Sequence, residues 1–125
     1  MWKNINGRLI HSTDETREKF RTSISNELLL KLEYLAEEYD TYINYLLETG
    51  IKKVLEADFI QYDKSLRPKD RVQYQTTYDK ALLKQLKQFA SEHKVFINDV
   101  IEYSTNYIDP NNVRKREHRN RIERF

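Results

Sequence analysis

Residues 19–55 contain the pattern that is most informative about the fold, KFRTSISNELLLKLEYLAEEYDTYINYLLETGIKKVL. Its first seven residues alternate in character, so that Phe20, Thr22 and Ile24 share one face. This period of two predicts a half-buried β-strand. From residue 28 the apolar positions recur at intervals of three and four, which predicts an amphipathic helix. A second helical stripe follows after a break near residues 40–41.

The same three-part pattern occurs a second time, 54 residues further along the chain. A gapless shift aligns residues 17–55 with 71–109, and ten of the 39 aligned positions are identical. The second copy contains a predicted strand over 73–78, an amphipathic helix and a more polar third segment. Chance similarity of two amphipathic helices does not explain the matching strand and the shared Ile-Asn pair. We therefore infer an internal duplication.

Three details support this division of the chain. Ser25 and Asp79 stand just before the first helix of each copy and are predicted N-caps. Gly50 falls inside the second helix of the first copy, where it costs about 1 kcal/mol relative to Ala. We expect close packing against a neighbouring helix to offset that cost. Residues 58–70 are predicted to link the two copies.

The composition bounds the class of protein. A length of 125 residues suits one compact domain or two small units that share a core, and 38% hydrophobic residues suffice for that core. The chain contains no cysteine, which excludes disulfides and thiolate metal sites. Residues 1–18 form a mixed arm without the apolar stretch of a signal peptide. We expect a soluble cytoplasmic protein at the nucleoid, with no membrane partner.

The net charge of +2 is distributed unevenly. Asp109-Pro110 either stops the last helix or begins a new one, and a tail over 110–125 follows. Residues 113–125 contain two acids and six basic residues, a net +4, so that residues 1–112 carry about −2. The basic residues are Arg114, Lys115, Arg116, Arg119, Arg121 and Arg124. This tail favours a polyanionic partner, although a merely solvated chain end has the same composition.

One strand followed by two helices resembles the ribbon-helix-helix family of Arc/MetJ-type DNA-binding repressors. The resemblance covers 19–55 and 73–108, and the join from LAEE to INYLL within residues 35–47 carries it most clearly. It implies a mainly α fold with a short two-stranded antiparallel ribbon. The units 19–57 and 71–109 would then form a tandem pseudo-dimer. A swapped arrangement between two chains remains open.

In this family the ribbon lies in the DNA major groove, and the outward strand side chains contact the bases. Carried over position by position, the base-contacting residues are Lys19, Arg21, Ser23, Gln73, Gln75 and Thr77. Arginine suits guanine, glutamine suits adenine, and threonine suits the thymine methyl group. A solvated strand face favours the same residue types. Arg21 discriminates between DNA reading and a protein-interaction role, because exposure on the ribbon supports base contact, whereas burial or pairing with acids weakens it.

The resemblance also implies a phosphate held at the start of each second helix. The expected phosphate contacts are Asn44, Asn98, Arg114, Lys115, Arg116, Arg119 and Arg121. The chain departs from the family pattern at Asp40 and Lys94, which stand in the turns where glycine is frequent. Tyr42 and Phe96 stand near the caps. Helix capping by the two asparagines is the alternative.

No motif predicts an enzyme. His11, His93 and His118 lack metal-ligand spacing, and no glycine-rich phosphate loop is present. We expect His93 at the edge of the core, and no metal or cofactor. The predicted function is sequence-specific binding of double-stranded DNA as a transcriptional regulator such as a repressor, with possible self-association along DNA. The alternatives are a protein-interaction module, antitoxin-like or adaptor, and an RNA-binding protein.

Overall fold

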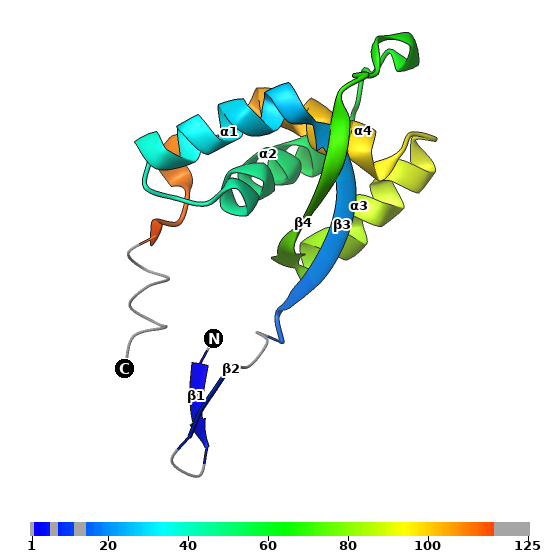
Figure 1. Ribbon diagram of the computed structural model, residues 1–125. Coiled ribbons are helices and arrows are strands. Elements are labelled where there is room, and N and C mark those ends of the chain that lie inside the picture. The colour runs from blue at the N-terminus through cyan, green and yellow to red at the C-terminus, as the bar shows by residue number, and fades with distance from the viewer. Residues whose placement is uncertain (1, 6–7, 12–14, 117–125) are drawn as a thin grey trace.

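The structure, a computed structural model, describes residues 2–5, 8–11 and 15–116 (Figure 1). Its described part is mainly helical, with four α-helices and a two-stranded antiparallel ribbon, as predicted. The strands and α-helices are β1 (Trp2–Ile5), β2 (Arg8–His11), β3 (Arg17–Ser25), α1 (Asn26–Glu38), α2 (Ile43–Ala57), β4 (Arg71–Asp79), α3 (Lys80–Glu92) and α4 (Ile97–Ser104). The short 3₁₀ helices are η1 (Lys64–Leu66), η2 (Thr105–Tyr107) and η3 (Pro110–Asn112).

The ribbon consists of β3 and β4, which pair antiparallel from Arg17 opposite Asp79 to Ser25 opposite Arg71. The predicted pairing of the two strands is confirmed, and each strand begins two residues earlier than expected. At the centre of the ribbon Arg21 lies opposite Gln75, which is also its equivalent in the 54-residue repeat. The two copies therefore contribute equivalent residues to the middle of the ribbon.

The core lies beneath the inner face of this ribbon. β3 contacts α1, α3 and α4, and β4 contacts α2 and α3, so each strand packs on helices of both copies (Figure 1). Ile24 and Tyr78, at equivalent positions of the two strands, are both fully buried. The helices add the buried residues Leu29, Leu32, Leu47, Ile51, Val54, Leu82, Leu83, Leu86, Phe89, Ala90, Val100 and Ile101. The two copies thus share one hydrophobic cluster.

The first helix of each copy starts where the sequence predicts. The Ser25 side chain accepts a hydrogen bond from the Leu28 N–H, and the Asp79 side chain accepts one from the Leu82 N–H. Each bond satisfies a backbone donor that has no partner within its helix. The turns after these helices pass through Asp40 and Lys94, whose φ angles are 52° and 56°. The left-handed conformation ends each helix although neither residue is glycine.

Gly50 lies where α2 crosses the end of α4. A Cβ atom at Gly50 would lie 3.0 Å from the carbonyl carbon of Ser104 and would overlap with its oxygen. Ser104 is the repeat equivalent of Gly50, so the two helices meet at matching positions. The predicted close helix packing at this glycine is confirmed.

Several boundaries differ from the prediction. The arm predicted over 1–18 contains a hairpin of β1 and β2, and its last two residues already belong to β3. α4 ends at Ser104, before the predicted residue 108, and η2 continues the chain. Asp109 caps η3 with Pro110 at its first position, which is the second of the two alternatives. None of the helices in the described ranges is long and apolar enough to span a bilayer.

Candidate nucleic-acid interface

The outer face of the ribbon carries the six predicted base-contacting side chains. Cross-strand register pairs Lys19 with Thr77, Arg21 with Gln75, and Ser23 with Gln73. Four of the six are exposed, and the two hydroxyl residues, Ser23 and Thr77, are half-buried. Arg21 donates a hydrogen bond from Nη2 to Oε1 of Gln75 at 3.3 Å. The described partner of Arg21 is therefore a neutral amide on an exposed strand. Exposure without an acidic partner is the condition under which Arg21 supports base reading.

Two buried glutamates anchor the ends of the ribbon to the second helices. Glu48 in α2 accepts hydrogen bonds from Arg17 at 3.1 Å and from the Asp79 N–H at 2.8 Å. The repeat equivalent, Glu102 in α4, pairs with Arg71 and accepts from the Ser25 N–H at 2.9 Å. Each carboxylate thus holds the strand of its own copy by an arginine and the strand of the other copy by a backbone amide. This arrangement ties both ends of the ribbon to α2 and α4.

The prediction of site residues missed this anchoring. A signal for it exists in the sequence, because the arginines at 17 and 71 and the glutamates at 48 and 102 are identities of the repeat. An Arg-Glu pair at identical positions of both copies indicates a shared structural role. The distance of 31 residues between the partners conceals the contact until the fold is known.

Asn44 and Asn98 bind the ribbon backbone. The Asn44 side-chain amide donates to the Thr77 carbonyl oxygen at 3.0 Å, and the Asn98 Oδ1 accepts from the Ser23 N–H at 3.1 Å. Each asparagine therefore reaches the strand of the other copy. The alternative that these asparagines cap their helices is wrong, because the N-cap positions belong to residues 42 and 96. Their expected phosphate contact stays a prediction; Asn44 already uses its side-chain NH2 group on the ribbon, and Asn98 uses its Oδ1.

The first residues of the basic tail dock on the turn between α1 and α2. Lys115 donates from Nζ to the Tyr39 carbonyl oxygen at 2.8 Å. Arg116 donates from Nε to the Thr41 carbonyl oxygen at 2.8 Å and pairs with Glu37 at 3.1 Å. Cations at the carboxyl end of a helix satisfy its last carbonyl groups and favour its dipole. Arg119 and Arg121 lie outside the described residues.

The start of α2 carries an arginine from outside the repeats. The Arg116 guanidinium lies over the Tyr42 ring, 5.3 Å from the ring centroid. The equivalent aromatic at the start of α4, Phe96, carries Arg67 from the linker at 4.3 Å. Cation–π contacts of this kind hold the tail and the linker against equivalent corners of the two copies.

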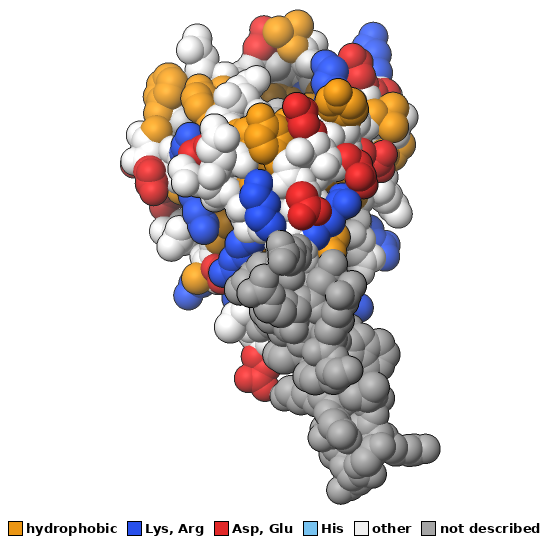
Figure 2. All heavy atoms as spheres, turned by 90° about the vertical axis from the view of Figure 1, so that its left-hand side faces the viewer, with side chains coloured by type: hydrophobic (Ala, Val, Ile, Leu, Met, Phe, Trp, Pro, Cys, Tyr) orange, Lys and Arg blue, Asp and Glu red, His pale blue; other side chains and the backbone are white. Residues whose placement is uncertain are grey.

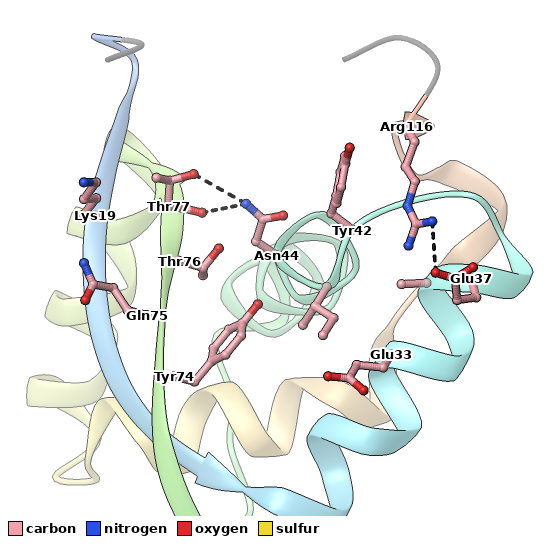
Figure 3. Close-up of a pocket in the computed structure, with 12 residues that line it drawn as sticks. Lys19, Glu33, Glu37, Tyr42, Asn44, Tyr74, Gln75, Thr76, Thr77 and Arg116 are labelled. Carbon is pink, nitrogen blue, oxygen red and sulfur yellow. Dashed lines mark hydrogen bonds and ion pairs between the residues drawn. The ribbon is translucent and has the colours of Figure 1, made fainter. Parts of the chain in front are cut away.

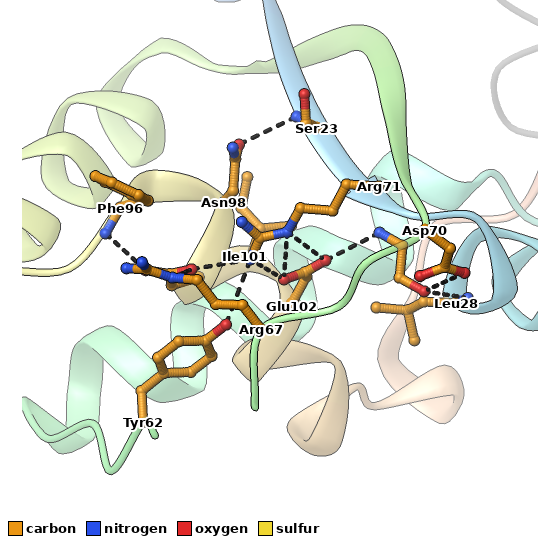
Figure 4. A network of polar contacts seen from close by, with 12 residues as sticks. Ser23, Leu28, Tyr62, Arg67, Asp70, Arg71, Phe96, Asn98, Ile101 and Glu102 are labelled. Atoms are coloured by element: carbon orange, nitrogen blue, oxygen red, sulfur yellow. Dashed lines mark hydrogen bonds and ion pairs between the residues drawn. The ribbon is translucent and has the colours of Figure 1, made fainter. Parts of the chain in front are cut away.

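The start of α4 also holds a network of charges (Figure 4). Asp99 accepts a hydrogen bond from the Phe96 N–H at 2.9 Å and pairs with Arg67 at 2.8 Å and Arg71 at 2.9 Å. Burial would raise the pKa of Asp99, but hydrogen bonds from the two arginines outweigh burial and lower the pKa to about 2. Hydrogen bonds that Arg71 donates to Glu102 and Asp99 in turn raise the pKa of Arg71. The Asp99 carboxylate thus occupies the Phe96 N–H at the start of α4, where an anion would otherwise bind.

A groove of about 600 Å³ runs along β4, between the ribbon and the start of α2 (Figure 3). Its walls include Glu33 and Glu37 from α1 and Tyr74 from the ribbon. On the other flank of the ribbon, the repeat equivalent of Glu33 is Lys87, whose ammonium group lies 5.0 Å from the Phe20 ring centroid. The groove therefore combines two acids with Lys19 and Arg116, and Lys87 places a cation on the other flank.

Charges of both signs mingle on the face around the turn between α1 and α2 (Figure 2). The figure shows no continuous patch of a single sign there. Comparisons with known proteins add no relative: no protein-family model, no curated protein and no solved structure matches this chain.

Proposed function

We propose that this chain is a DNA-binding regulator of the ribbon-helix-helix type, in which the two copies act as the halves of one pseudo-dimer. The exposed pair of Arg21 and Gln75 at the centre of an anchored ribbon carries the proposal. A two-stranded ribbon fits the width of the major groove, where each base pair presents its own pattern of donors and acceptors. The side chains on this face match that chemistry.

The proposed reading of the bases follows the cross-strand pairs. Arg21 binds guanine O6 and N7, and Gln75 binds adenine N6 and N7 at a neighbouring base pair. Lys19 adds a cation at one end of the ribbon, whereas Ser23 and Gln73 leave the other end neutral. Equivalent positions carry different side chains, so the preferred site lacks twofold symmetry. The backbone anchors described above keep these side chains in position when DNA binds.

The test is a selection of bound duplexes from a random library at several salt concentrations, with the wild type, Arg21→Ala and Gln75→Ala. Removal of a good bidentate hydrogen-bond pair costs about 1–3 kcal/mol and relaxes one base position. We expect the two variants to relax different positions. A Lys31→Ala variant on the exposed face of α1 is the matched control, since its side chain is 72% exposed and pairs with Glu27 of the same helix. Unchanged selection by both ribbon variants would refute base reading.

A protein-interaction role is the second candidate, and one observation favours it. Leu30 and Tyr34, one helical turn apart on α1, are 57% and 73% exposed. Adjacent exposed apolar side chains are typical of a contact surface. Leu30→Ser with Tyr34→Ser should leave the affinity for a single DNA site unchanged and abolish any association of the protein with itself or with a partner protein. Sedimentation of the protein with and without DNA distinguishes these outcomes.

A further inference from the structure

Asp58, Glu92 and His93 come together where α2 and α3 end. Asp58 follows α2 as its left-handed cap residue, Glu92 is the last residue of α3, and His93 caps that helix. One potential ligand atom from each of the three lies within 4.8 Å of the others. The linker and β4 separate Asp58 from the other two in the sequence, so only the packing of α2 against α3 creates the cluster.

Two contacts with Phe89 orient the imidazole of His93. Its Nδ1 lies 2.9 Å from the Phe89 carbonyl oxygen, and because that oxygen can only accept, Nδ1 carries the proton. The ring also stacks on the Phe89 ring, with centroids 4.0 Å apart. Nε2 therefore points toward Asp58, whose Oδ1 is 4.0 Å away. Metal-binding histidines commonly donate their other ring nitrogen to a backbone carbonyl in this way.

The electrostatic environment favours a cation at this position. The carboxyl ends of α2 and α3 both lie at the cluster, and unpaired carbonyl groups give such ends a partial negative charge. The carboxylates of Asp58 and Glu92 add to this potential.

We propose that Asp58, Glu92 and His93 bind a divalent transition-metal ion such as Zn²⁺. One imidazole nitrogen with two carboxylates suits Zn²⁺ or Co²⁺, whereas Mg²⁺ and Ca²⁺ prefer oxygen ligands alone. Ligand distances near 2.1 Å require the three atoms to draw together by about 1 Å. The side chain of Asp58 is 77% exposed, and Glu92 is exposed too, so rotamer changes achieve this. The bound ion joins a helix of the first copy to a helix of the second.

The experiment measures thermal unfolding of the full chain after removal of metals with a chelator. Addition of Zn²⁺ or Co²⁺ at about a hundredfold excess over Kd should raise Tm by about 5 °C or more, and Mg²⁺ should not. His93→Gln, Asp58→Asn and Glu92→Gln should each remove most of this shift. Asparagine tolerates the left-handed conformation, so Asp58→Asn preserves the backbone. Glu38→Gln, the equivalent last residue of α1, is the matched control and should keep the full shift.

A second readout is the visible absorption of bound Co²⁺, which intensifies when protein ligands replace water. This absorption tests metal binding if thermal unfolding proves irreversible. If the His93 variant fails to fold, the variants at the exposed positions 58 and 92 test the site instead. Absence of any effect of Zn²⁺ would overturn the proposal. An effect that persists in the His93 and Glu92 variants would also overturn it, because the ion would then bind elsewhere, for example at His11 or His118.

Discussion

Replacement of Gly50 by alanine tests the helix crossing at the centre of the core. In an isolated helix this change is favourable by about 1 kcal/mol, because alanine loses less conformational entropy. Here the new Cβ atom would overlap with the backbone carbonyl of Ser104, which cannot rotate away as a side chain can. Overpacking of a core costs about 1–3 kcal/mol, and a backbone contact belongs at the upper end of that range. We expect a net loss of about 2 kcal/mol.

Urea unfolding followed by circular dichroism measures this loss. The midpoint should fall while the slope m stays constant, since the surface exposed on unfolding hardly changes. Thermal unfolding should show a Tm lower by roughly 6 °C. Lys52→Ala, an exposed position on the same helix, should stay within about 0.5 kcal/mol of the wild type. Equal or higher stability of the Gly50 variant would show that α2 and α4 do not cross at this glycine.

Three further predictions concern the tail, the core and pH. Deletion of residues 117–125 keeps the docked start of the tail and removes three arginines. The slope of log K against log salt for DNA binding should then flatten by about 0.9 for each phosphate that the tail no longer neutralises. An unchanged slope would exclude the tail from DNA binding. Tyr78→Phe should leave the unfolding free energy unchanged or raise it by up to about 1 kcal/mol, because the buried hydroxyl has no hydrogen-bond partner among the described residues. A clear decrease in the unfolding free energy would show that the hydroxyl has a hydrogen-bond partner. Because the pKa of Asp99 is lowered to about 2, below its unfolded value of about 3.9, its carboxylate stabilises the fold above pH 4 and loses this effect as the pH falls toward 2. Denaturant unfolding at pH 7 and pH 3 should therefore show a smaller difference for Asp99→Asn than for the wild type, and an equal difference would contradict the network.

Several predictions from the sequence were correct because they depend on local physics. Alternation identified the inner face of both strands, and the side chains at Ile24 and Tyr78 are buried as that pattern requires. The caps at Ser25 and Asp79 were correct because a side-chain acceptor three residues before the first buried leucines satisfies a free backbone donor. Gly50 indicated a close helix contact, since a glycine inside a helix is otherwise unfavourable.

The roles of the polar residues were harder to predict. Asn44 and Asn98 were assigned to phosphates or caps, whereas the fold directs them to the backbone of the opposite strand. Lys115 and Arg116 were assigned to phosphates, and in the described structure they bind carbonyl groups at the end of α1. A polar side chain carries no local sign of its partner when that partner lies 33 or 75 residues away.

Sequence patterns were sufficient to infer the duplication, the order of strand and helices in each copy, and the faces that turn inward. Periodicity and capping act over a few residues, so they can be read without the fold. Three contacts became visible only in the folded structure: the Arg21–Gln75 hydrogen bond, the bonds of Glu48 to both strands, and the approach of Asp58 to His93. These interactions join segments that are distant in the chain. Their geometry depends on how the two copies pack against each other, and no local pattern encodes that packing.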